Sequence, residues 1–117
     1  MEIEQKSVGG VAIRFISGPL VEKTITILKP VTIIGRDPQS DIVVFDPRVS
    51  RRHACIRMIN DSWSIENLSQ SSYITINQQQ TQHGVLQNNN VVGLGENTSF
   101  VFPVSYTHLT LPTNREV

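Results

Sequence analysis

The chain has 117 residues and a formal net charge of zero, with 38% hydrophobic and 17% charged residues. This length allows one globular domain that buries its own core. A balanced charge provides no long-range attraction to nucleic acid or to an anionic membrane, so we expect neither as a partner. Cys55 is the only cysteine, which excludes an intrachain disulfide and a cysteine-ligated zinc cluster. We expect no metal ion and no cofactor.

The first residues of the chain do not have the pattern of a secretory signal. Glu2, Glu4 and Lys6 are charged, and no apolar stretch lies among them. No apolar run elsewhere approaches the length of a membrane-spanning helix. We therefore expect a cytoplasmic location and no membrane contact from this domain.

Short alternating runs rich in β-branched residues predict an all-β fold. The expected strands are about nine in number and span residues 11–16, 24–27, 31–34, 42–44, 54–59, 63–66, 74–77, 91–94 and 100–102. Turn residues separate them, and Asn60-Asp61 predicts a tight hairpin. The runs at residues 78–80 and 88–90 are interpreted as polar loops. Because no helical period appears, the pattern favours a sandwich or a barrel.

Two segments carry side chains suited to a bound anion. Gly35-Arg36 follows an expected strand, where glycine permits a close backbone approach and arginine offers a planar fork for phosphate oxygens. Ser50-Arg51-Arg52-His53 precedes another strand and adds a hydroxyl group and two further cations. A serine-rich loop at residues 67–73 can hold the backbone of an extended peptide. Each feature is common by itself, and only their combination points to a site.

These segments together resemble the forkhead-associated (FHA) domain. The resemblance rests on Gly35-Arg36, Ser50-Arg51-Arg52-His53, Asn67-Leu68 and Asn77, in this order and at this spacing. Residues 86–95 resemble the late hairpin of the family, and residues 100–102 resemble its closing strand. The resemblance implies a two-sheet β-sandwich that binds phosphothreonine peptides through loops at one end.

The resemblance also implies a role for each matching residue. Arg36, Ser50 and Arg51 would contact the phosphate, and Arg36 could instead contact the peptide backbone. Ser71 and Ser72 would complete the phosphopeptide-binding set. Gly35, His53 and Asn77 would support the site without touching the ligand.

The chain departs from the family pattern in the serine-rich loop. Ser72-Tyr73 stands where the family has Asn-Gly, and Ser72 is a shorter substitute for an asparagine that grips the peptide. A residue with a Cβ atom at position 73 also resists a positive φ angle. This departure predicts a weaker hold on the peptide than on the phosphate.

The domain organisation follows from the extent of the resemblance. We interpret residues 1–10 as an N-terminal tail and residues 11–103 as an FHA-like phosphopeptide-binding domain. Residues 104–117 fit no sandwich strand and resemble a translated sequencing adapter, so we expect a non-native tail, with a genuine linker as the alternative. The domain would then be the N-terminal module of a larger protein.

The functional prediction is a module for reversible, phosphothreonine-dependent protein–protein interaction in signalling. Its partner would be a threonine-phosphorylated protein or peptide. The alternative is a structural or oligomerising sandwich with a degenerate phosphate site. A hydrolase that uses Ser50 and His53 is disfavoured, because no acid partner or oxyanion motif accompanies them. We therefore expect no enzymatic activity.

Overall fold

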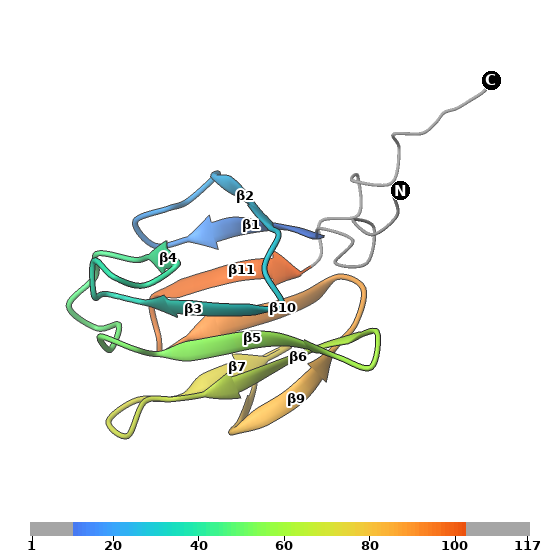
Figure 1. The fold of residues 1–117 in the computed structure, drawn as a ribbon. Coiled ribbons are helices and arrows are strands. Elements are labelled where there is room, and N and C mark those ends of the chain that lie inside the picture. Colours follow the sequence, from blue (N-terminus) through green and yellow to red (C-terminus); the bar gives the residue numbers. More distant parts are fainter. Residues whose placement is uncertain (1–10, 103–117) are drawn as a thin grey trace.

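The computed structural model describes residues 11–102, which form two β-sheets packed face to face (Figure 1). The strands are β1 (Val11–Ser17), β2 (Thr24–Ile27), β3 (Val31–Gly35), β4 (Ile42–Val43), β5 (Ala54–Ile59), β6 (Ser62–Asn67), β7 (Ile74–Ile76), β8 (Gln79–Thr81), β9 (His83–Leu86), β10 (Asn90–Leu94) and β11 (Thr98–Phe102). No helix occurs within this range, and therefore none that could cross a membrane. The predicted two-sheet β-sandwich is confirmed.

The two sheets divide the strands unequally. The six-stranded sheet has the order β2-β1-β11-β10-β7-β8, and the five-stranded sheet has the order β4-β3-β5-β6-β9. All neighbouring strands are antiparallel except β3 and β4, which are parallel. The connections β3–β4, β4–β5, β6–β7 and β10–β11 gather at one end of the sandwich (Figure 1). This end holds the residues of functional interest.

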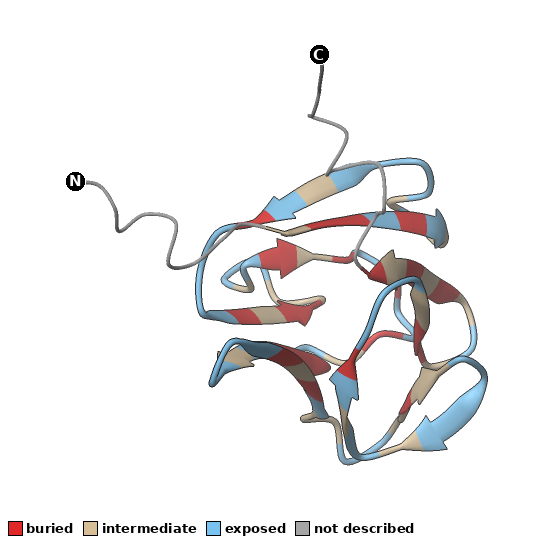
Figure 2. Cartoon of the chain, turned by 90° about the vertical axis from the view of Figure 1, so that its right-hand side faces the viewer, coloured by how far each residue is buried: buried red, intermediate tan, exposed pale blue. Residues whose placement is uncertain are grey.

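The core forms from side chains that alternate along the strands, as Figure 2 shows by the alternation of buried and exposed segments. In β1, Ile13 and Phe15 are fully buried while Arg14 is exposed. Phe15 packs against Phe100 with ring centroids 5.3 Å apart, and tilted aromatic pairs of this kind add to the gain from apolar burial. The core therefore joins strands that are distant in sequence and fixes the positions of the loops at both ends.

Two strands, β8 and β9, were not predicted from the sequence. β8 contains glutamines that were assigned to a polar loop, and it pairs with β7 through a two-residue turn at Asn77 and Gln78. These residues have φ angles of 51° and 72°, which suit a two-residue hairpin. β8 is an exposed edge strand, so its polar composition carries no burial signal. The predicted hairpin at Asn60 and Asp61 is confirmed, with Ile59 paired to Ser62.

The expected late hairpin at residues 86–95 is wrong. β9 pairs with β6 in the five-stranded sheet, whereas β10 pairs with β11 and β7 in the other sheet. The segment between β9 and β10 therefore crosses between sheets, and the true hairpin is β10–β11. The predictions for residues 1–10 and 104–117 lie outside the described residues.

Candidate functional site

A pocket of about 420 Å³ opens among the loops at one end of the sandwich. Its wall consists of Arg36 after β3, residues 47–50 before β5, residues 71–73 before β7, and residues 95–96 in the β10–β11 turn. Loops that adjoin strands of both sheets thus contribute to the pocket. Among the side chains predicted from sequence, the structure brings Arg36, Ser50, Ser71 and Ser72 together here.

Arg36 is held by backbone carbonyl groups and keeps part of its guanidinium group available. Its backbone N–H donates to the Ser50 carbonyl at 3.0 Å, and its side-chain Nε donates to the Val49 carbonyl at 2.9 Å. The ion pairs found in residues 11–102 do not involve Arg36. Its two terminal nitrogens therefore remain for an anion, in the fork geometry that matches phosphate oxygens.

Gly35 allows the end of β3 to lie directly against the loop that follows Ser50. A Cβ atom at position 35 would lie 2.0 Å from the Arg51 carbonyl oxygen and 2.7 Å from its carbon. Both contacts are with backbone, which has little freedom to move aside. The close approach carries the hydrogen bonds from Arg36 N–H to the Ser50 carbonyl and from Asp37 N–H to the Arg51 carbonyl. Glycine is thus a steric requirement of the pocket wall.

His53 is fully buried and connects two loops of the pocket. The Ser50 N–H donates to Nδ1 at 3.1 Å, and Nε2 lies 2.8 Å from the Tyr73 carbonyl. Because Nδ1 accepts, the ring proton lies on Nε2 and is donated to Tyr73. Burial lowers the pKa of His53, against an opposing effect of the Tyr73 carbonyl. The imidazole is therefore a neutral brace with both nitrogens in use.

Because both nitrogens of His53 are hydrogen-bonded to backbone groups, Ser50 and His53 do not form the hydroxyl–imidazole pair that a serine nucleophile needs. The Ser50 hydroxyl pairs with the Ser69 hydroxyl at 2.6 Å, and only the Ser50 backbone N–H pairs with the imidazole. A general base must reach the proton that it abstracts, and His53 has no free acceptor to do so. The arrangement supplies hydrogen-bond donors and cations without an activated nucleophile.

The serine-rich loop has an internal set of hydrogen bonds. The Asn67 side chain accepts from the Ser69 N–H at 3.2 Å and donates to the Ser69 carbonyl at 3.1 Å. Tyr73 is absent from the residues with positive φ in the range 11–102, so the conformational strain expected from its side chain does not arise. The loop reaches the pocket by a path that needs no glycine at this position.

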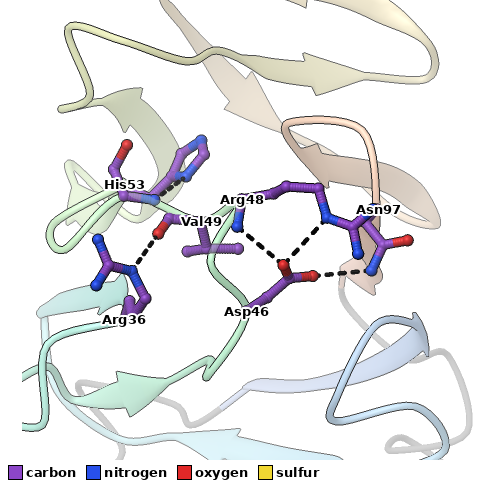
Figure 3. Close-up of polar contacts among 7 residues, drawn as sticks. Arg36, Asp46, Arg48, Val49, His53 and Asn97 are labelled. Carbon is purple, nitrogen blue, oxygen red and sulfur yellow. Dashed lines mark hydrogen bonds and ion pairs between the residues drawn. The ribbon is translucent and has the colours of Figure 1, made fainter.

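A second arginine, which sequence reasoning missed, lines the pocket. Arg48 lies beside the buried carboxylate of Asp46, which accepts from the Arg48 N–H at 2.9 Å, from Arg48 Nε at 3.3 Å and from the Asn97 amide at 2.8 Å. Figure 3 shows Asp46 between Arg48 and Asn97, with Arg36 on the Val49 carbonyl. The Arg48 N–H and then the Asn97 amide hold the pKa of Asp46 below its ordinary value. The sequence signal next to Arg48 was the Asp46-Pro47 pair, which indicates the end of a strand and no ligand contact.

Two predicted site residues lie elsewhere. Arg51 has an exposed side chain beside Ser50 and does not line the pocket, although its carbonyl accepts from Asp37 N–H. Asn77 follows β7 at the strand end opposite to the pocket. There its N–H donates to the Val91 carbonyl at 2.7 Å and its side-chain oxygen accepts from the Val91 N–H at 2.9 Å. Asn77 thus ties the β7–β8 turn to β10 instead of contacting the pocket.

The cation in the pocket that has no carboxylate partner is Arg36. The ion pairs found in residues 11–102 do not involve it, whereas Arg48 is paired with Asp46, and Glu96 contributes one carboxylate at the β10–β11 turn. The hydroxyl groups of Ser50, Ser71 and Ser72 provide further donors. Within residues 11–102, no three His, Cys, Asp or Glu side chains gather closely enough to hold a metal ion. The fold and this pocket define a β-sandwich with a loop-end site for an anionic group.

Comparison with known proteins identifies the family. The sequence model of the FHA domain matches residues 32–95, which is more than half of the chain. The chain belongs to the FHA domain family. It is similar to the glycogen accumulation regulator GarA of Mycobacterium tuberculosis, with 30% identity over 79 residues that cover 68% of this chain and 49% of that protein. The chain thus spans about half the length of the curated relatives it matches.

Solved structures give the same result. An FHA domain from Chlamydia trachomatis is 29% identical, with a TM-score of 0.71 over 79% of this chain and 94% of that one. A structure from an analysis of phosphothreonine-dependent FHA domain interactions is 27% identical, with a TM-score of 0.68 over 79% of this chain and 94% of that one. The FHA resemblance inferred from sequence is therefore confirmed.

Proposed function

We propose that this domain binds threonine-phosphorylated peptides reversibly and that the pocket holds the phosphate group. The observation that carries the proposal is the convergence of Arg36 and Ser50, from separate loops, on one pocket. The related domain studied for phosphothreonine-dependent interactions supports the same ligand. The domain acts as an interaction module and not as an enzyme, and we place it in the cytoplasm.

The proposed roles follow from the positions of the side chains. Arg36 pairs with phosphate oxygens through its terminal nitrogens, and Ser50 donates its hydroxyl hydrogen to the same group. Ser71 and Ser72 contact the peptide next to the phosphate. Arg48 adds positive charge inside the pocket, while the exposed Arg51 adds it from outside.

The strength of such contacts suits reversible binding. A phosphothreonine carries about −1.5 to −2 charges near neutral pH. Each hydrogen bond to a charged group contributes about 1.5–3 kcal/mol net, so three or four of them give roughly −4.5 to −12 kcal/mol before ordering costs. The middle of this range, about −8 kcal/mol, corresponds to an affinity of about micromolar order.

Titration of phosphothreonine peptides against their unphosphorylated forms, over a broad library, tests the proposal. We expect binding to require the phosphate and to fall by at least about tenfold in Arg36→Ala and Ser50→Ala, because each change removes a charge-assisted hydrogen bond. Arg57→Ala is the matched control, since Arg57 lies on β5 in an exposed pair with Glu66. Equal binding of the two peptide forms, or normal binding by either pocket variant, would contradict the proposal.

The second candidate is a structural or oligomerising sandwich with a degenerate phosphate site. Its motivation is Ser72-Tyr73, which replaces the peptide-gripping Asn-Gly pair of the family. This candidate predicts self-association that is independent of phosphate. Analytical ultracentrifugation with and without phosphopeptide distinguishes the two candidate functions. A domain that stays monomeric and binds only the phosphorylated peptide would exclude the oligomerising sandwich.

A further inference from the structure

A pair of serine hydroxyl groups lies at the edge of the pocket, and only one of the two faces the ligand. Ser50 lines the pocket, whereas Ser69 is absent from its wall. Their Oγ atoms are 2.6 Å apart, which is a short hydroxyl–hydroxyl hydrogen bond. The distance alone leaves open which serine is the donor.

The other partners of Ser69 settle the direction of this bond. Ser69 Oγ accepts from the Ser72 N–H at 2.9 Å and from the Ser71 N–H at 3.2 Å. A hydroxyl oxygen has two lone pairs and one hydrogen, so both lone pairs of Ser69 are in use. Its hydrogen must therefore be donated to Ser50 Oγ.

This direction determines what Ser50 can offer to a ligand. Ser50 Oγ accepts the hydrogen of Ser69, and the Ser50 N–H is already bonded to His53. Ser50 Oγ makes no other hydrogen bond within residues 11–102, so its hydroxyl hydrogen is free to be donated into the pocket. Arg36 nitrogens are also donors only. The polar groups nearest to the proposed phosphate therefore match a ligand whose oxygens accept hydrogen bonds.

We propose that Ser69 is a positioning residue that presents the Ser50 hydroxyl as a donor and so tunes the pocket to the fully deprotonated phosphate. This inference rests on the proposed function. Ser69 does not touch the ligand and acts through Ser50. Ser69 Oγ also accepts from the Ser71 and Ser72 N–H groups, so one atom is hydrogen-bonded to both the Ser50 loop and the serine-rich loop.

A double-mutant cycle of phosphothreonine-peptide affinity tests the proposal, with Ser69→Ala, Ser50→Ala and the double variant. We expect Ser69→Ala to weaken binding about 5- to 10-fold when Ser50 is present, as for the loss of one oriented hydrogen bond. In the Ser50→Ala background the same change should cost clearly less, because only the part of its effect that passes through the Ser71 and Ser72 N–H groups remains. Ser69→Thr keeps the hydroxyl group and should restore most of the affinity.

A control separates this role from a general loss of structure. Ser17 and Ser99 form a similar hydroxyl pair at 2.7 Å that does not line the pocket, and Ser99→Ala should leave affinity unchanged. Ser69→Cys, of similar size, serves in the same cycle if Ser69→Ala fails to fold. Equal losses from the Ser69 change with and without Ser50, or no loss at all, would overturn the inference while leaving phosphopeptide binding intact. Equal affinity of the wild-type domain for the phosphorylated and unphosphorylated peptides would instead contradict both the proposed function and this inference.

Discussion

Gly35→Ala adds one methyl group at the point where β3 meets the loop after Ser50. The new Cβ atom would lie 2.0 Å from the Arg51 carbonyl oxygen. Ordinary contacts of this kind are near 3.5 Å, so one backbone segment must move by more than 1 Å. The segment carries the hydrogen bonds from Arg36 and Asp37 N–H to the loop, at 3.0 and 3.1 Å.

The cost follows from two contributions. Overpacking of a close-packed region costs about 1–3 kcal/mol, and each weakened hydrogen bond costs up to about 1 kcal/mol. We expect a loss of about 3 kcal/mol in the free energy of unfolding. For a domain of this size that corresponds to a decrease in Tm of roughly 12–24 °C.

Urea unfolding followed by tryptophan fluorescence measures this loss, because the single tryptophan, Trp63, lies in the core. Gly84→Ala is the matched control, since its Cβ atom would meet only the flexible end of Ile76, at 2.8 Å. We expect Gly84→Ala to stay within about 1 kcal/mol of the wild type. If Gly35→Ala unfolds at the same urea concentration as Gly84→Ala, the steric argument for the pocket wall is wrong.

Two further predictions concern the pH dependence of stability. Hydrogen bonds lower the pKa of Asp46 in the folded state, so its contribution is complete above the ordinary value of 3.8 and is lost as pH falls below it. Asp46→Asn should therefore flatten the decline in unfolding free energy below pH 4, and an unchanged slope would contradict this. Burial lowers the pKa of His53, so the unfolded chain binds the proton first and stability declines below pH 6.5 by at most about 1.4 kcal/mol per pH unit. A chemical-denaturation series from pH 8 to 5 measures this slope, and His53→Gln should lack it if the assignment is right.

The fold and part of the pocket could be predicted because their signals are local. Alternation of apolar and polar residues depends on strand geometry alone, so most strands were located without knowledge of their partners. Arg36 and Ser50 were predicted from a sequence pattern and both line the pocket. Each is close in sequence to a residue with a strict structural requirement. Gly35 is needed for close backbone approach, and His53 fills a buried position with two hydrogen bonds. Such requirements leave a recognisable pattern in the sequence.

The remaining parts of the site depend on contacts between distant segments. Arg48 enters the pocket because Asp46 orients it, and Asp46 in turn is bonded to Asn97, which is 51 positions away. No local pattern indicates such a contact. The resemblance implied a phosphate contact for Arg51, but its side chain is exposed to solvent and does not line the pocket. Strand β8 was missed for a related reason, since an exposed edge strand has no apolar face to mark it.

The neutral net charge of the chain is compatible with a site for a doubly charged anion, because the carboxylates that form ion pairs in residues 11–102 do so with cations other than Arg36. The Asp46 carboxylate accepts hydrogen bonds from Arg48 Nε, from the Arg48 backbone N–H and from the Asn97 amide, so neutral donors as well as a cation stabilise its charge. Arg36 is fixed by the Val49 carbonyl, a neutral partner, and so keeps its full charge for a ligand. Other cations, such as Arg57 and Lys29, form pairs with carboxylates on other parts of the surface. The charge of Arg36 is therefore left for a ligand because the carboxylates pair with other cations, and this requires no excess of basic residues in the sequence.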